Sequence, residues 1–285
     1  MANDNIGILH PGEMGISIAA SAQNTGHTVH WVSTGRSLQT RERAQKRGLV
    51  EVQSLAALCE TCPIIVSVCP PGAAEAVAHD VLAHGFTGLY LDANAISPQR
   101  AVRIGQAMAE AGVAFVDGGI IGGPAWKPGR TWLYLSGPEA DKAAACFAAG
   151  PLETGIVGEA IGKASALKMC FAAYTKGTTA LLCAILATAE RLDVRTELAR
   201  QWSHNDSEFA EQTVQQVRQV TAKAWRFTGE MEEIAATFRE AGLPAEFHLA
   251  AADVYQRLVE FKGEPETPAL DEVLLALLRS GVDDV

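Results

Sequence analysis

The feature that most constrains the fold is a short apolar segment followed by a glycine-spaced turn near the N-terminus. Residues 6–15 read Ile-Gly-Ile-Leu-His-Pro-Gly-Glu-Met-Gly. The run 6–9 predicts a buried strand, and the small residues that follow predict a closely packed helix over 13–25. Residues 28–32 then read as a second strand. A strand, a tight turn, a helix and a second strand in this order predict a βαβ unit of the dinucleotide-binding type.

Each part of the turn has an expected role in holding a dinucleotide. Gly12 lets the backbone approach a pyrophosphate, and Gly15 lets the helix pack closely on the strand. The first N–H groups of the helix donate to the phosphates. The usual G-x-G-x-x-G pattern has His10 at its first position here. The residues expected at the pyrophosphate are His10, Pro11, Gly12, Glu13, Met14 and Gly15.

Strands and helices alternate up to about residue 158, which predicts a parallel sheet covered on both faces. The further strands expected are 63–69, 88–92 and 113–117, with 131–136 and 154–157 as edge strands. The helices expected between them are 37–47, 72–84, 98–111 and 139–148. One long helix is expected over 160–191, followed by helices at 195–204, 206–221, 224–241, 245–261 and 270–279. The chain is therefore predicted to be α/β, with a Rossmann doubly wound parallel sheet in 1–158 and an all-α substrate and dimerisation domain in 159–285.

Composition and charge exclude several other classes of protein. The formal net charge of −10 argues against nucleic acid as a general partner. The polar N-terminus does not read as a signal peptide, and the longest apolar region, 178–189, is too short to span a membrane. Six cysteines scattered through apolar segments indicate a reducing, cytoplasmic compartment. Cys59 and Cys62 form one C-x-x-C without a second ligand pair, so no metal site is expected.

The residues after the second strand bear on the choice between NAD and NADP. An NAD site usually has an acidic residue here, and Ser33-Thr34-Gly35-Arg36 contains none. Ser33 and Thr34 can hydrogen-bond a phosphate, and Arg36 can pair with it through two N–H groups. We therefore expect NADP to be preferred. The alternative is that Arg36 is only a solvated turn residue.

Two further segments are expected at the carboxyl edge of the sheet, where ligands bind in such folds. Cys69-Pro70-Pro71 follows one strand and forms a rigid wall, and Asn94 follows the next strand. Both segments are expected to bind the cofactor, with Asn94 at its nicotinamide half. The glycine-rich segment 117–123 is expected to be a loop whose N–H groups gather around a substrate carboxylate. The alternative is a flexible loop between domains.

Lys168 is the candidate catalytic residue. It lies in the long apolar helix, where a charge is rarely placed without a purpose. Its ammonium group could polarise a carbonyl and donate a proton as a hydride arrives. Taken alone, a lysine near the start of a helix is more often a surface residue.

These segments, in this order, resemble the β-hydroxyacid dehydrogenase superfamily, which includes 3-hydroxyisobutyrate, tartronate-semialdehyde and 6-phosphogluconate dehydrogenases. The family's Gly-Leu-Gly-x-Met-Gly turn matches 10–15, and its Asp-x-Pro-Val-Ser-Gly-Gly segment matches 117–123. Its Gly-x-Gly-x-x-x-Lys segment matches 162–168, with Ala164 in place of the second glycine. The resemblance implies that Lys168 is the general acid/base and that Gly122 and Gly123 present N–H groups to the substrate.

The chain departs from the family around the substrate. Ile121 stands where the family has Ser, Ala172 where it has Asn, and Gly229-Glu230 where it has Lys-Asp. The helical part resembles a divergent subgroup. Lys176 lies two helical turns after Lys168 on a similar face, where it either assists an anionic group or caps the rim of the site. The residues expected at the substrate are Ile121, Gly122, Gly123 and Lys176.

The sequence therefore predicts an NADP-dependent oxidoreductase that acts on a small hydroxy acid or its oxo-acid or aldehyde counterpart. An anionic small-molecule substrate and a homodimer are expected, without nucleic acid or membrane as partner. Two alternatives stay open: an imine reductase on the same fold, against which Lys168 argues, and a non-catalytic NADP-binding sensor.

Overall fold

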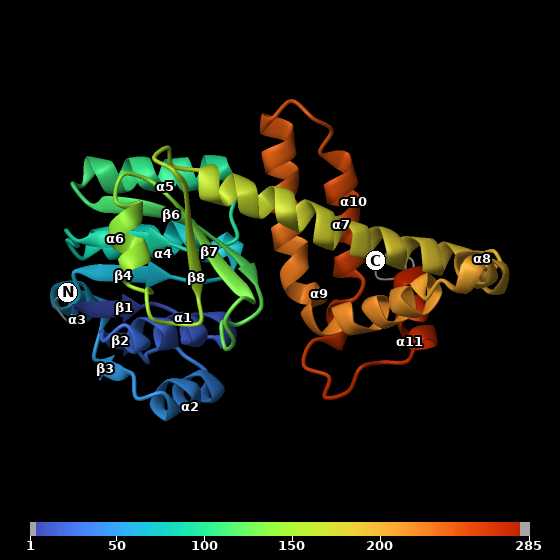
Figure 1. The fold of residues 1–285 in the computed structure, drawn as a ribbon, viewed down its shortest axis with the longest axis horizontal. Coiled ribbons are helices and arrows are strands. Elements are labelled where there is room, and N and C mark those ends of the chain that lie inside the picture. The colour runs from blue at the N-terminus through green and yellow to red at the C-terminus, as the bar shows by residue number, and fades with distance from the viewer. Residues whose placement is uncertain (1–3, 280–285) are drawn as a thin grey trace, which may run out of the picture. The chain divides into compact units, whose positions relative to one another are not determined.

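The computed structural model describes residues 4–279, which form two compact units divided between Met169 and Cys170. The first unit is built on an eight-stranded sheet within the described residues, in the order β3-β2-β1-β4-β5-β6-β7-β8 (Figure 1). Neighbouring strands are parallel except β6 and β7, which are antiparallel. The strands are β1 Asn5–Ile8, β2 Thr28–Val32, β3 Val50–Val52, β4 Ile64–Ser67, β5 Leu89–Asp92, β6 Ala114–Gly122, β7 Thr131–Ser136 and β8 Glu153–Gly158.

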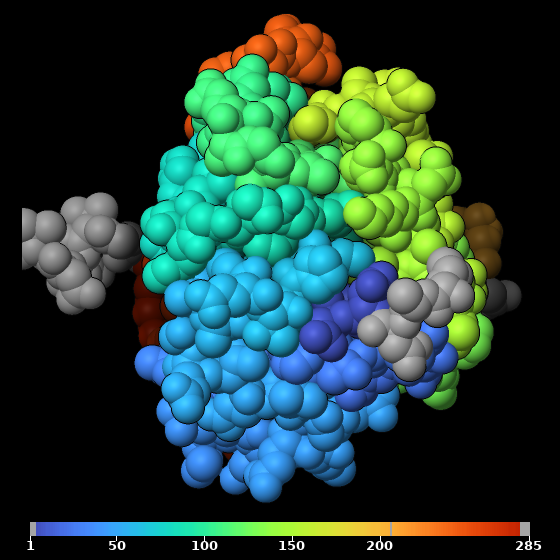
Figure 2. Space-filling view, turned by 90° about the vertical axis from the view of Figure 1, so that its left-hand side faces the viewer, coloured from blue at the N-terminus to red at the C-terminus, as the bar shows by residue number. Residues whose placement is uncertain are grey.

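Helices cover both faces of this sheet, as the alternating pattern predicts. Alternate strand residues enter two separate apolar clusters; in β4, Ile64 and Val66 belong to one and Ile65 to the other. Helices α1 and α6 contribute to the first cluster, and α3, α4 and α5 contribute to the second. The surface in Figure 2 follows the strand order, with the blue α2–α3 region and the green α5 region at opposite ends. The helices are α1 Glu13–Asn24, α2 Leu38–Lys46, α3 Leu55–Thr61, α4 Ala74–Ala83, α5 Pro98–Glu110 and α6 Ala140–Ala145.

The second unit is helical. Helix α10 packs along α9, and Figure 1 shows the two side by side in orange and red. Helix α7 begins in the first unit and continues into the second. The boundary between the units thus lies after residue 169, within α7, whereas the sequence places the domain boundary at residue 158. The helices are α7 Lys163–Arg191, α8 Arg195–Trp202, α9 Phe209–Glu240, α10 Glu246–Gln256 and α11 Leu270–Leu278.

Three sequence-based expectations about local structure were incomplete or wrong. Residues 206–221 and 224–241 are not two helices, because no Gly or Pro lies between 221 and 224 to end the first one, and the single helix α9 continues through Gly229. Residues 118–122 are not a loop, because they continue β6 and pair with β7. Strand β3 and helix α3 were not expected; β3 is too short and too exposed to show a clear alternating pattern.

Helix α7 is long and apolar enough to cross a membrane by length and composition alone. Half of its most apolar window is buried inside the protein. Core helices of globular proteins pass the same test, and the first turns of α7 pack directly on β6. We therefore interpret α7 as a core helix.

Candidate functional site

The turn between β1 and α1 has the geometry of a phosphate cradle. A Cβ atom at Gly15 would lie 2.1 Å from the carbonyl oxygen of His10, so only glycine lets α1 begin this close to the end of β1. At Gly12 a Cβ atom would meet nothing within 4 Å, so the space in front of the turn is open. Gly12 is the N-cap of α1 and no side chain caps the helix, which leaves its first N–H groups for a ligand. These features fit the pyrophosphate of a dinucleotide.

Two polar side chains beside the turn have buried atoms without a hydrogen-bond partner among the described residues: His10 through Nδ1 and Arg36 through Nε. Burial, and then the nearby Arg36 charge, lower the pKa of His10 to about 4. His10 is therefore neutral near pH 7. Arg36 is half-buried, and its charge also acts on Cys69, which follows β4. The charge of Arg36 thus acts on residues of both the turn and the segment after β4, and their contact with a cofactor stays a prediction.

An acidic residue missed by the sequence analysis lies at the end of β2. The Ser33 hydroxyl donates a hydrogen bond to the Glu51 carboxylate, and Glu51 belongs to the neighbouring strand β3. The residues that follow β2 in the sequence include no acidic residue, but Glu51 lies next to them in the structure. Glu51 is paired with Trp31, two residues before Ser33, and it could not be found from the sequence because strand β3 was not expected.

Asn94 links the ends of β4 and β5 through both ends of its side-chain amide. Its Oδ1 accepts from the backbone N–H of Cys69 at 2.5 Å, and its Nδ2 donates to Ser67 Oγ at 3.1 Å. Its own N–H donates to Asp92 Oδ1 at 3.0 Å. Asn94 is buried, so it holds the wall that begins at Cys69 and continues through Pro70 and Pro71. Contact between Asn94 and the nicotinamide stays a prediction.

The glycine-rich segment 118–122 is a strand that makes room for a helix and for its partner strand. A Cβ atom at Gly119 would lie 2.6 Å from the Ala164 carbonyl oxygen and 2.9 Å from Lys168 Cβ. Gly122 has φ +119°, and a Cβ atom there would lie 2.3 Å from the Arg130 carbonyl oxygen. Ile121 is buried, whereas a Cβ atom at Gly123 would meet nothing within 4 Å. The backbone is therefore open at Gly123 and closed at Gly119 and Gly122, and its contact with a substrate stays a prediction.

Asp117 holds the start of α7, a role that the sequence analysis did not assign. Its buried carboxylate accepts through Oδ2 from the N–H groups of Gly162 and Ser165, both at 3.0 Å, and from Ser136 Oγ at 2.9 Å. Oδ1 accepts from Ser165 Oγ at 2.5 Å. A negative charge at a helix N-terminus satisfies its free N–H groups and its dipole. A buried Asp at the end of an apolar strand was the signal for this role.

Lys168 is half-buried and lies on the face of α7 that packs against β6. Because Gly119 has no side chain, the Lys168 Cβ approaches the β6 backbone closely. Asp117 at the start of the helix and Gly119 beneath it together fix the position of the lysine. Lys168 thus lies beside the strand that leads to Gly122 and Gly123.

Lys176 lies in the second unit and already has an anionic partner there. Its Nζ is 2.9 Å from Glu230 Oε2, and the two side chains are 13% and 14% exposed. The ammonium also lies 4.8 Å from the centre of the Phe227 ring, and Tyr255 donates to the Lys176 carbonyl at 2.7 Å. The carboxylate neutralises the lysine, so this pair ties α7 to α9. Its role toward substrate stays a prediction.

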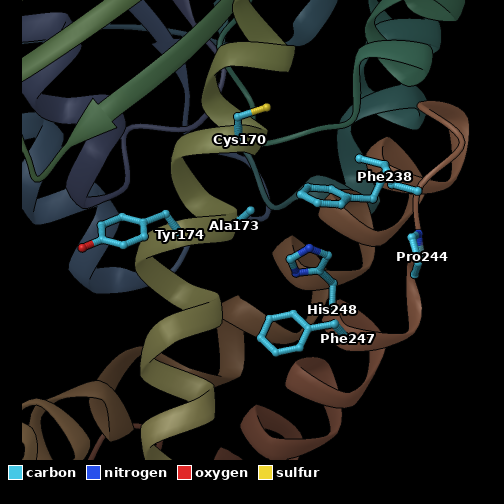
Figure 3. Close-up of a pocket in the computed structure, with 8 residues that line it drawn as sticks. Cys170, Ala173, Tyr174, Phe238, Pro244, Phe247 and His248 are labelled. Carbon is cyan, nitrogen blue, oxygen red and sulfur yellow. The ribbon is translucent and has the colours of Figure 1, made fainter.

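The helical unit also holds an apolar cavity of about 540 Å³. Figure 3 shows the rings of Phe238, His248 and Phe247 turned toward α7. His248 is buried, its Nδ1 has no hydrogen-bond partner among the described residues, and burial lowers its pKa from the ordinary value. The sequence analysis missed this cavity because its residues are scattered over three segments. They are Cys170, Ala173, Tyr174, Phe238, Leu243, Pro244, Phe247 and His248.

Within residues 4–279, no group of three or more His, Cys, Asp and Glu side chains could hold a metal ion. Burial is the main cause that raises the pKa of Cys59 to about 11 and that of Cys62 to about 12. Both are therefore protonated near neutral pH, unlike thiolates that bind metal or exchange disulfides.

Comparison with known proteins agrees with this geometry. Residues 5–146 match the NAD binding domain of 6-phosphogluconate dehydrogenase, and residues 189–258 match a domain of unknown function, DUF1932. An uncharacterized 28.5 kDa protein of Methanothermus fervidus is 32% identical over 166 residues, which cover 58% of this chain and 62% of that protein. The match thus spans less than two thirds of the relative.

Solved structures extend the likeness over nearly the whole chain. A conserved protein of unknown function, itself similar to 3-hydroxyacid dehydrogenases, has 27% identity and TM-score 0.65, covering 90% of this chain and 97% of that one. Mycobacterium tuberculosis 3-hydroxyisobutyrate dehydrogenase with L-serine has 17% identity and TM-score 0.68, covering 98% and 100%. Reductive aminases and imine reductases share the fold at lower TM-scores. The chain belongs to the β-hydroxyacid dehydrogenase superfamily, with a 6-phosphogluconate dehydrogenase-like NAD-binding domain and a helical C-terminal domain.

Proposed function

We propose that the protein is an NADP-dependent oxidoreductase that interconverts a small hydroxy acid and its oxo-acid or aldehyde counterpart. The observation that carries this proposal is the position of Lys168. It lies against Gly119, in a helix whose N-terminus is held by the buried Asp117 carboxylate. A lysine that is fixed in this way, beside the strand leading to Gly122 and Gly123, is preorganised for proton transfer.

The residues present fit a nicotinamide dinucleotide. The open turn at Gly12 and the first N–H groups of α1 would hold its pyrophosphate, and Arg36 would pair with a 2′-phosphate. When bound, the nicotinamide supplies or accepts the hydride. In the reducing direction the carbonyl carbon gains the hydride, and the carbonyl oxygen takes a proton from Lys168 Nζ. Solvent then returns a proton to the neutral amine; oxidation runs through the same groups in reverse.

The proposed substrate is an anionic small molecule. Gly123 presents open backbone directly after β6, the strand against which Lys168 packs, and such N–H groups suit a carboxylate. Ile121 is apolar where the superfamily resemblance leads one to expect a hydroxyl, so this part of the site cannot hydrogen-bond a substrate side chain. We therefore propose a substrate whose non-reacting part is short or apolar.

We also propose that the protein is a cytoplasmic homodimer. Large apolar side chains are exposed along α7, including Phe171, Tyr174 and Leu181. An exposed apolar stripe of this kind is typical of a protein interface. What supports a cytoplasmic compartment is that Cys59, Cys62, Cys69, Cys146, Cys170 and Cys183 are not paired in disulfides.

The test is Lys168→Met, which keeps the length of the side chain and removes its proton donor. Lys163→Met is the matched control, because Lys163 is exposed and lies earlier on the same helix. NADPH binding is measured by its fluorescence, and turnover by NADPH absorbance across a panel of hydroxy acids and oxo acids. Lys168→Met should bind NADPH normally and lose 10²-fold or more in turnover, on the order of a general acid/base contribution.

Two results would contradict the proposal in different ways. Near-normal turnover in Lys168→Met removes the lysine from the chemistry. Tight NADPH binding by the native chain, with no turnover across the panel, favours a sensor instead.

A further inference from the structure

Two residues of opposite charge belong to segments that contact Ser33, at the end of β2. Arg36 follows β2, its backbone N–H donates to the Ser33 carbonyl at 3.0 Å, and its buried Nε has no hydrogen-bond partner among the described residues. Glu51 comes from β3, and its carboxylate accepts the hydrogen bond of Ser33. Ser33 directly follows the last residue of β2, the position that contacts the ribose hydroxyls in dinucleotide-binding folds. Ser33 thus has an anion at its hydroxyl group and a cation three residues further along the same turn.

These two charges act in opposite directions on the 2′ position of the ribose. A carboxylate accepts a hydrogen bond from a free 2′-hydroxyl and repels a 2′-phosphate. The Ser33 hydroxyl can donate to a 2′-phosphate only if it leaves Glu51. Arg36 attracts the phosphate and gains much less from a hydroxyl. Selectivity between NADP and NAD therefore depends on both residues.

We infer that Glu51 is a specificity-determining residue of the dinucleotide site, which limits the preference for NADP that Arg36 provides. This inference rests on the proposed function, because it concerns the cofactor of the same site. In NAD-binding folds an acidic residue at the end of the second strand usually has this role, and here Glu51 of the adjacent strand β3 would take it. The native chain is expected to bind both dinucleotides, with a modest preference for NADPH.

The test measures the dissociation constants of NADPH and NADH for the full-length chain by fluorescence titration, without any substrate. The variants are Glu51→Gln, Arg36→Gln and, as a control with the same change of charge, Glu60→Gln. Glu60 lies in the last turn of α3, before β4 begins, and hence far from the carboxyl edge where the ribose would lie. Circular dichroism establishes that each variant is folded.

Glu51→Gln should raise the ratio of NADPH to NADH affinity about tenfold, because one repulsive charge beside the phosphate is lost. Arg36→Gln should lower that ratio by about tenfold or more, and Glu60→Gln should leave it within twofold. A ratio that Glu51→Gln leaves within twofold of native overturns the inference and leaves the proposed function standing. A native chain that binds neither dinucleotide overturns both.

Discussion

Replacing Asp117 by Asn should loosen the start of α7 and, with it, the position of the proposed catalytic lysine. The carboxylate is buried and accepts from Ser136, Gly162 and Ser165, with three of the four donors on Oδ2. Asparagine has nearly the same shape, but it is neutral and replaces one acceptor by an NH₂ donor. The Ser165 hydroxyl can rotate to accept from that donor, so the main loss is the charge at Oδ2.

The size of the effect follows from these three bonds. A hydrogen bond to a charged group contributes about 1.5–3 kcal/mol and a neutral one about 0.5–1.5 kcal/mol, a difference of about 1 kcal/mol per bond. The cost of burying the native charge offsets part of this gain. We therefore expect Asp117→Asn to lower the free energy of unfolding by about 2–3 kcal/mol. In a unit of this size that corresponds to a fall in Tm of roughly 4–12 °C.

The assay is scanning calorimetry of the native chain and the variant, with hydrogen exchange of the first turn of α7 as a local readout. Asp80→Asn is the matched control, because Asp80 is exposed on α4 and should change stability by less than about 0.5 kcal/mol. Faster exchange should be confined to the first turn of α7. A Tm shift no larger than that of the control, with unchanged exchange, would refute the role given to Asp117.

Three further predictions concern other buried positions. Gly119→Ala puts a Cβ atom 2.6 Å from the α7 backbone, so it should lower the free energy of unfolding by roughly 1–3 kcal/mol in calorimetry and reduce turnover. Gly123→Ala, in open space, is the control and should be as stable as the native chain. Equal stabilities of the two variants would contradict the close packing of β6 against α7. Burial raises the pKa of Asp92 to about 7, so the native carboxyl keeps a proton that the unfolded chain loses near pH 4. The free energy of unfolding of the native chain, measured in urea relative to Asp92→Asn, should therefore fall by up to about 4 kcal/mol as pH rises from 4 to 7. A difference between the two proteins that does not change with pH would show the surroundings of Asp92 to be polar. Lys176→Met or Glu230→Gln alone should lower the free energy of unfolding by about 3–5 kcal/mol, because each leaves one charge without its partner. The double variant should lose much less than either single variant. A loss in the double variant equal to the sum of the two single losses would exclude a coupled ion pair.

The fold of the first unit could be predicted largely from local patterns. Strand β2 and strand β7 have the predicted bounds, because apolar runs between turn residues are strong local signals. The glycine segment 118–122 could not be predicted in the same way. Its glycines indicate a loop by composition, whereas they are needed because α7 and Arg130 approach the strand at distances that no Cβ allows. Such a requirement depends on residues far away in the sequence.

The residues of the candidate site also fall into two groups, those that local sequence motifs predict and those that depend on the fold. The phosphate turn and Lys168 follow from local motifs and from the superfamily resemblance. Glu51 and the partners of Asp117 depend on which strands and helices become neighbours, and Glu230 depends on the packing of α9 against α7. A sequence pattern names a charged residue, but only the fold shows which opposite charge or donor it meets.

The central claim is that this chain transfers a hydride between NADPH and a carbonyl carbon with Lys168 as proton donor. The most direct measurement is deuterium transfer from NADPH labelled at C4, followed by mass spectrometry of the products from a panel of small oxo acids. We expect deuterium on the carbinol carbon of at least one product with the native chain, and at least 10²-fold less with Lys168→Met. Binding of NADPH without deuterium in any product, or equal transfer by both proteins, would contradict it.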